Sequence, residues 1–152
     1  MADETDAERL EALGNLLWDE RRLIEAAEAF EVAADLREEL GLDTPPTAII
    51  SNRGAARRLR VTAWATARWP GQIDDLAVHP ENVRGARRAR RFFSVRPRLG
   101  GVLRHQRPIY LVAIDQRGRV DLATRRETDA WLADRHHLAS SLFVARPPRR
   151  RR

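Results

Sequence analysis

The sequence predicts a mainly α-helical fold with one β-hairpin: an acidic N-terminal helical hairpin, a central helical bundle, and a C-terminal β-hairpin followed by a helix. Two hydrophobic patterns indicate this fold. Apolar residues recur at helical spacing over residues 5–40, and a continuous apolar segment at 109–114 precedes a turn. Charge also divides the chain, since residues 1–46 contain 14 acidic and 4 Arg side chains and residues 47–152 contain 8 acidic and 24 Arg.

This charge asymmetry favours a polyanionic partner for the basic part. The two parts have net charges of −10 and +16, which give +6 for the whole chain. All 28 cationic side chains are Arg, which excludes a Walker A lysine and a Schiff-base lysine. A GC-rich genome, or escape from lysine-directed modification, would explain the missing lysine. The absence of cysteine excludes disulfides, a thiol nucleophile and a Cys-based zinc site.

The length of 152 residues fits one domain, or a small domain with an appendage. No apolar run approaches 18 residues, and the first residues are acidic rather than basic. We therefore expect no membrane span and no secretory signal, and a cytoplasmic location.

Residues 5–40 are expected to form two antiparallel helices, with Thr5 or Asp6 capping the first and Gly41 ending the second. Over residues 7–40, the spacing resembles one tetratricopeptide repeat, through Leu13, Gly14, Leu17, Ala26, Phe30 and Ala33. The resemblance implies that small residues lie where the helices cross. Because a single repeat is not stable alone, we expect the hairpin to pack on its own domain, on a second copy or on a partner. The family's glycine between the helices is Arg21 here. A generic helical hairpin is the alternative.

Residues 54–71 are predicted to form two short helices, within a bundle whose leading helix spans 47–53. The first runs over Ala55–Leu59 and breaks at Arg60-Val61, Thr62 caps the second, and Pro70-Gly71 ends it. This stretch resembles the helix-turn-helix of small bacterial regulators and phage proteins. The resemblance implies that the second helix enters the DNA major groove and that Arg68 reads or grips DNA. The alternative is a single Ala/Arg-rich helix that packs Leu59 and Trp69 into a core.

Residues 79–98 form another basic segment. His79-Pro80 is expected to open a helix, which would contain Arg84, Arg87, Arg88, Arg90 and Arg91. With Arg96 and Arg98, residues 84–98 contain seven positive and no negative side chains, a density that suits contact with phosphates. The alternative is a surface helix that pairs with the acidic hairpin.

The C-terminal part is predicted to contain a strand at 109–114, a Gly turn at 116–118 and a return strand at 119–123. Asp115 and Asp121 are interpreted as turn residues, not metal ligands. A helix over 124–142, capped by Thr124 or Thr128, follows. Its adjacent His136 and His137 point about 100° apart, so we expect no metal site there.

These patterns predict an acidic helical hairpin at 1–42, a basic α+β domain at 43–145 and a disordered Arg-rich tail at 146–152. The predicted function is nucleic-acid binding, with DNA favoured over RNA, by a protein of bacterial, phage or plasmid regulatory type. We expect no catalytic residues, no metal and no cofactor. The candidate binding residues are Arg57, Arg58, Arg60, Thr62, Trp64, Arg68, Arg84, Arg87, Arg88 and Arg91.

Two other functions remain open. A non-enzymatic adaptor would bind a protein partner, or form a homo-oligomer, through residues 5–40. A metal-independent ribonuclease would use His105, Tyr110 and arginines. This function remains open because such active sites leave little signature in a sequence.

Overall fold

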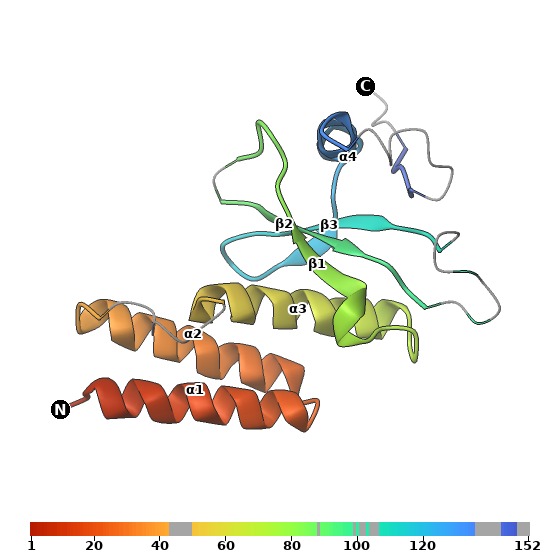
Figure 1. Ribbon diagram of the computed structural model, residues 1–152. Helices are drawn as coiled ribbons and strands as arrows, with labels where there is room; N and C mark the ends of the chain where they lie inside the picture. Colours follow the sequence, from red (N-terminus) through yellow and green to blue (C-terminus); the bar gives the residue numbers. More distant parts are fainter. Residues whose placement is uncertain are drawn as a thin grey trace. The chain divides into compact units, whose positions relative to one another are not determined.

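The computed structural model describes residues 1–42, 50–87, 89–98, 100, 103, 107–135 and 144–148. Its elements are α1 (Glu4–Asp19), α2 (Leu23–Glu39), α3 (Asn52–Arg68), a 3-10 turn (Asp75–Ala77), β1 (Val78–Glu81), β2 (Arg91–Val95), β3 (Tyr110–Ile114), β4 (Val120–Leu122) and α4 (Arg125–Ala133), drawn in Figure 1. The predicted class is confirmed: helices at the N-terminus, then a hairpin and a helix. Two compact units divide within α3, Met1–Ala63 (unit 1) and Trp64–Arg152 (unit 2), whereas the sequence placed a boundary after residue 42.

In unit 1, α1 and α2 form the predicted hairpin. Asp3 rather than Thr5 or Asp6 caps α1: its side chain accepts the Asp6 amide, and the Asp6 carboxylate accepts the Asp3 amide. Gly41 follows α2 with a φ of +66°, as expected for a glycine that ends a helix. Arg21 lies in the tight turn that joins the two helices and has a φ of +62°.

The helices of unit 1 approach closely where the sequence has small residues. A Cβ added to Gly14 would lie 2.8 Å from two ring carbons of Phe30, so only glycine fits there without displacing the ring. Phe30 is 5 % exposed. The core of unit 1 joins α1 and α2 to the beginning of α3 through Leu17, Ala26, Ala27, Ala29, Phe30, Ala55, Ala56 and Leu59.

Residues 52–68 form one continuous helix, so the predicted break at Arg60-Val61 is wrong. Neither Gly nor Pro occurs between Ala55 and Trp69, and nothing else stops a helix there. Thr62 does not cap a second helix, because its hydroxyl donates to the Arg58 carbonyl oxygen one turn earlier, at 2.8 Å. The single Ala/Arg-rich helix, with Leu59 buried, is the arrangement that the structure has. It ends just before Pro70-Gly71, as predicted.

Unit 2 contains a four-stranded antiparallel sheet in the order β1-β2-β3-β4. The predicted pair at 109–123 is confirmed as β3 and β4, with Ala113 opposite Asp121. The helix predicted from His79 onward is wrong, because these residues form β1 and its loop. Pro80 lies in an edge strand, opposite Phe93, where a missing N–H is tolerated. Gly85, with a φ of +71°, adopts a turn conformation that a helix does not have.

Helix α4 covers one face of this sheet (Figure 1). Its N-terminus is closed by a capping box between Thr124 and Glu127, which confirms Thr124 as the cap. The core between helix and sheet consists of Phe92, Ile109, Leu111, Ala113, Ala123, Trp131, Leu132 and Val144. Alternate residues of the central strands are also buried on the other face, among them Val95, Val112 and Ile114. Burial on both faces accounts for the continuous apolarity of the strand at 109–114. His136 and His137 lie outside the described residues.

Among the helices that the structure describes, none is both long and apolar enough to cross a bilayer.

Candidate functional site

The topology of the sheet brings two basic loops to one end of unit 2. Because β1–β2 and β3–β4 are both antiparallel neighbours, the β1–β2 loop (82–90) and the β3–β4 turn (115–119) leave the sheet at the same end. Together with Arg91, these segments contain seven Arg and one acidic residue, Asp115. Of the six that the structure describes, five are exposed, and we name them the loop-end arginines: Arg84, Arg87, Arg91, Arg117 and Arg119.

Three of the loop-end arginines, Arg84, Arg87 and Arg91, were predicted as binding residues, although on a helix. Arg88 lies outside the described residues. Arg84 pairs with Asp134 at 3.2 Å, but its side chain is 86 % exposed, so the pair is easily exchanged for another anion. Arg117 and Arg119 were missed, although their place beside the predicted Gly turn would have located them at a hairpin tip.

The carboxylates near this end are already in use. Asp115 Oδ1 accepts the backbone amides of Arg117 and Arg119, both at 2.9 Å, which confirms it as a turn residue. Glu127 accepts two hydrogen bonds of 2.8 Å from Arg90. Within the described part of the chain, Arg87, Arg91, Arg117 and Arg119 form no ion pair. Their charge is therefore available to an external anion.

Glu127 shows how strongly the Arg90 contact acts. Burial raises the pKa of Glu127, but the hydrogen bonds from Arg90 and from the Thr124 backbone, with the Arg90 charge, outweigh burial and hold the pKa below its ordinary value. Glu127 therefore stays ionised, and Arg90 serves the structure rather than a ligand.

The predicted residues of α3 are divided between the two units. Arg57, Arg58, Arg60 and Thr62 belong to unit 1. There, Arg60 pairs with Glu31 through Nε at 2.8 Å. Its neighbour Arg53 contacts Asp35 at 2.9 Å and Glu38 at 2.6 Å. Carboxylates of α2 thus neutralise these two arginines inside unit 1.

Arg57 and Arg58 are half-buried and each already has an interaction within the protein, and Thr62 is 5 % exposed. Buried Thr62 has no surface to offer a nucleic acid. The helix-turn-helix geometry that would have placed these residues in a groove is absent from the continuous helix.

Trp64 and Arg68 belong to unit 2, where they form an aromatic cluster with Trp69 and Tyr110. The guanidinium carbon of Arg68 lies 5.4 Å from the ring centroid of Trp64 and 5.4 Å from that of Trp69. The rings of Trp69 and Tyr110 are 4.6 Å apart. Arg68 is exposed while both indoles are half-buried. The cluster therefore holds one cation over aromatic faces at the surface.

The described residues provide no site for a metal ion or for the alternative ribonuclease function. No three His, Asp or Glu side chains gather there as a metal-binding group. Of the two residues named for a ribonuclease, Tyr110 stacks on Trp69 and His105 lies outside the described part of the chain. Comparison with protein families, curated proteins and solved structures found no match for this chain.

Proposed function

We propose that this protein binds nucleic acid through unit 2, with the loop-end arginines as its main contacts. The observation that supports this is that, within the described part of the chain, four of the five loop-end arginines form no ion pair although all five are exposed at that end of the sheet. Self-repulsion among so many like charges is relieved when phosphates neutralise them and release counterions. Because these contacts address the backbone, they provide affinity rather than sequence readout.

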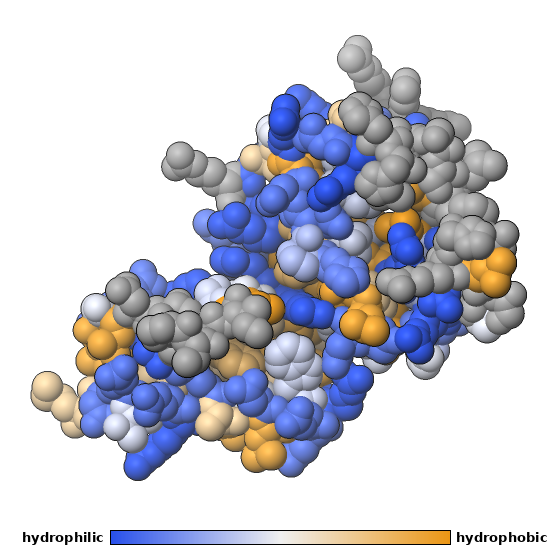
Figure 2. Space-filling model, in the orientation of Figure 1, coloured by the Kyte–Doolittle hydropathy of each residue, from blue (hydrophilic) through white to orange (hydrophobic). Residues whose placement is uncertain are grey.

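The division of charge between the units supports the same proposal. Unit 1 has 8 Arg and 14 acidic residues, a net charge of −6, whereas unit 2 has 20 Arg and 8 acidic residues, a net charge of +12. Figure 2 shows hydrophilic side chains over much of the face it draws. A net charge of this size concentrates polyanions around unit 2 and speeds their association.

Arg68 adds a second kind of contact. Because it is held against two indoles, its guanidinium loses less conformational freedom on binding than a free arginine would. It can clamp a phosphate or stack on an exposed base, since both geometries suit a planar cation beside aromatic rings.

The test compares two variants that remove equal charge. The loop variant is Arg87→Gln/Arg117→Gln/Arg119→Gln, and the control variant is Arg9→Gln/Arg22→Gln/Arg126→Gln, whose arginines are also exposed. Fluorescence anisotropy with a labelled 20-base-pair duplex and a single strand of the same length measures both at low salt. The loop variant should bind roughly ten- to thirtyfold more weakly on every sequence, by analogy with the salt sensitivity of phosphate contacts.

The control variant should bind nearly as well as the parent. Equal losses in both variants would show that net charge alone is responsible and not this end of the sheet. No binding by the parent at low salt would reject the proposal.

An adaptor role is a second candidate, favoured by apolar exposure on unit 1. Leu13 and Leu16, three residues apart on one face of α1, are 44 % and 55 % exposed, and Val32 of α2 is 52 % exposed. Association through this surface would survive high salt, unlike phosphate contacts. Sedimentation in high salt tests it: a complex, with a second copy or with another protein, should be lost in Leu13→Asp/Leu16→Asp. Loss of association with rising salt would contradict it.

A further inference from the structure

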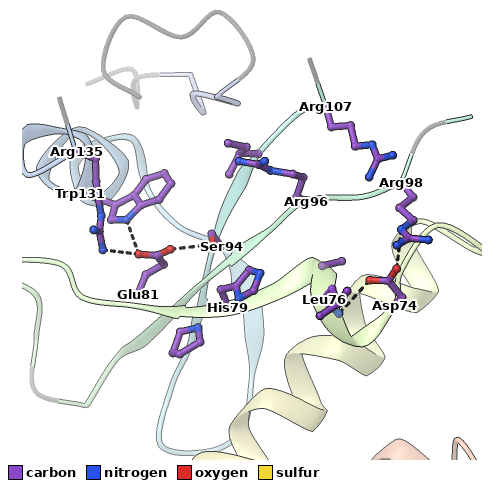
Figure 3. Close-up of a pocket in the computed structure, with 13 residues that line it drawn as sticks. Asp74, Leu76, His79, Glu81, Ser94, Arg96, Arg98, Arg107, Trp131 and Arg135 are labelled. Atoms are coloured by element: carbon purple, nitrogen blue, oxygen red, sulfur yellow. Dashed lines mark hydrogen bonds and ion pairs between the residues drawn. The ribbon is translucent and has the colours of Figure 1, made fainter. Parts of the chain in front are cut away.

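We propose that unit 2 also contains a binding site for a phosphate monoester, separate from the loop-end arginines. A pocket of about 580 Å³ lies between β1, β2, the segment before β3 and the end of α4 (Figure 3). This volume is typical of small-molecule sites. Its charged lining consists of Arg96, Arg98, Arg107, Arg135, Asp74 and Glu81, which together have a formal charge of +2.

The backbone after β2 presents two of these arginines to the pocket. The Arg96 amide donates to the Ala77 carbonyl oxygen at 2.9 Å, and the Arg98 amide donates to that of Gln72 at 2.7 Å. Pro97, between them, is fully buried. Because successive residues of an extended chain point to opposite sides, Arg96 and Arg98 face the same side. The two backbone hydrogen bonds, to Ala77 and Gln72, hold this segment in place.

Glu81 cannot balance the remaining positive charge, because its oxygens are already occupied. Its Oε2 accepts from Trp131 Nε1 at 3.1 Å and from Arg135 at 2.8 Å, and its Oε1 accepts from the Ser94 hydroxyl at 2.9 Å. Figure 3 shows these three donors around one carboxylate. Glu81 and Arg135 therefore neutralise one another and form one wall of the pocket.

Asp74 is similarly committed on the opposite side. Its Oδ2 pairs with Arg98 Nε at 2.6 Å, and its Oδ1 accepts the Leu76 amide at 3.0 Å. The two carboxylates thus compensate Arg98 and Arg135, and neither of them pairs with Arg107.

Arg107 is the residue that points to a ligand. Its Nε is buried and, within the described part of the chain, has no hydrogen-bond partner. Arg107 and Arg98 lie on the same side of the pocket, away from the Glu81 wall (Figure 3). A buried cationic donor without an acceptor is unfavourable unless an anion or water completes it. A phosphate fits because its oxygens accept from a guanidinium fork, and because its negative charge suits a positively charged lining.

Such a phosphate has two sources with the same chemistry: a free phosphorylated small molecule, or the terminal phosphate of a nucleic-acid strand. The pocket has room for more than the phosphate alone, because its volume exceeds that of a single anion.

Calorimetry on the full chain, at constant ionic strength, tests the site with inorganic phosphate, adenosine 5′-monophosphate and adenosine. The first two should bind, and adenosine should not. Arg107→Gln should weaken binding roughly ten- to a hundredfold, the loss expected for a charge-assisted hydrogen bond. Arg98→Gln, at an exposed position, is a second variant with the same expected direction. Arg87→Gln, among the loop-end arginines, is the matched control and should bind phosphate like the parent.

Thermal melting separates a lost site from lost folding. Phosphate should raise the Tm of the parent but not of Arg107→Gln, which without phosphate should melt no lower than the parent because it loses an unpartnered buried donor. Absence of phosphate binding in the parent, or equal weakening by Arg87→Gln and Arg107→Gln, would overturn the proposal.

Oligonucleotides with and without a 5′-phosphate distinguish the two sources. Tighter binding of the phosphorylated strand, lost in Arg107→Gln, assigns the strand end; equal binding of both strands, with phosphate still bound, assigns a small molecule. The loop variant should retain phosphate binding, so failure of the nucleic-acid proposal and failure of this one are seen separately.

Discussion

Arg37 shows how a single charged residue can hold the hairpin of unit 1 together. It is 5 % exposed, and its Nη2 contacts Glu11 Oε1 at 2.6 Å. Asn52 of α3 donates to the other oxygen of Glu11 at 3.0 Å. The three residues therefore join all three helices of unit 1 through one partly buried carboxylate.

Arg37→Ala should lower the free energy of unfolding by roughly 3–5 kcal/mol, because it leaves Glu11 enclosed without its cation. Arg37→Met/Glu11→Leu, which removes both charges and keeps the volume, should be within about 1 kcal/mol of the parent. Urea unfolding measures both. Similar losses in the single and double variants would contradict this explanation, because the ion pair itself, and not the uncompensated charge of Glu11, would then account for the loss.

Glu127 predicts a pH dependence in unit 2. Its pKa is lower in the folded state than in the unfolded state, so its contribution to stability is present above the ordinary glutamate value of about 4.3 and is lost as the pH falls through the folded value. Glu127→Gln should therefore be less stable than the parent at neutral pH, and the difference should shrink below about pH 4. Urea unfolding as a function of pH measures this, with exposed Glu28→Gln as control. A difference independent of pH would contradict it.

At the scale of elements, Gly14 and Phe30 define the crossing of α1 and α2. Phe30→Ala should cost roughly 3–5 kcal/mol, as for a buried aromatic side chain. Gly14→Ala should cost about 1 kcal/mol, because the clash with the ring exceeds the gain in helix propensity.

In the Phe30→Ala background, the same Gly14→Ala change should instead stabilise by up to about 1 kcal/mol, since the ring is gone and the propensity gain remains. A double-mutant cycle by urea unfolding measures this change of sign. An unaltered effect of Gly14→Ala in the two backgrounds would mean that the ring and the glycine do not determine the crossing.

The elements with strong local signals could be predicted from the sequence. The period of Leu17, Ala26 and Phe30 predicted the hairpin, and the apolar run at 109–114 with its Gly turn predicted β3 and β4. The Thr124 cap and the end of α3 before Pro70 also follow from local chemistry. In each case the residues that specify the element lie within it or directly next to it.

Where the prediction was wrong, the local sequence was compatible with two different structures. Thr62 suits an N-cap, but in a helix without Gly or Pro its hydroxyl can equally bond one turn back, as it does. Pro80 suits a first helical turn and also an edge strand. Phe92, Phe93 and Val95 lie in a buried strand, and only its pairing with Tyr110–Ile114 decides between helix and strand.

The candidate sites also contain features that the sequence predicts and features that depend on the fold. The arginine density at 84–91 was visible in the sequence, but its meeting with Arg117 and Arg119 depends on strand order. The pocket was not predicted, since Glu81, Trp131 and Arg135 are distant in sequence and their contacts arise only from the fold.

At the scale of the whole molecule, the two units differ in how far their charged side chains form ion pairs. In unit 1, carboxylates of α2 pair with Arg53 and Arg60 of α3, so part of the acidic excess is used internally. In unit 2, Arg90 and Arg135 are paired in the same way, yet the loop-end arginines remain exposed. This difference, more than the net charge of +6, supports a polyanion partner for unit 2.

The salt dependence of binding tests this central claim most directly. The slope of log Kobs against log salt concentration counts the phosphates that a protein neutralises, at about 0.9 per contact on duplex DNA. The parent should give a steep negative slope, the loop variant a slope shallower by about 2 to 3 units, and the control variant a slope like the parent's. Parallel slopes for the parent and the loop variant would contradict the claim, because the loop-end arginines would then release no counterions.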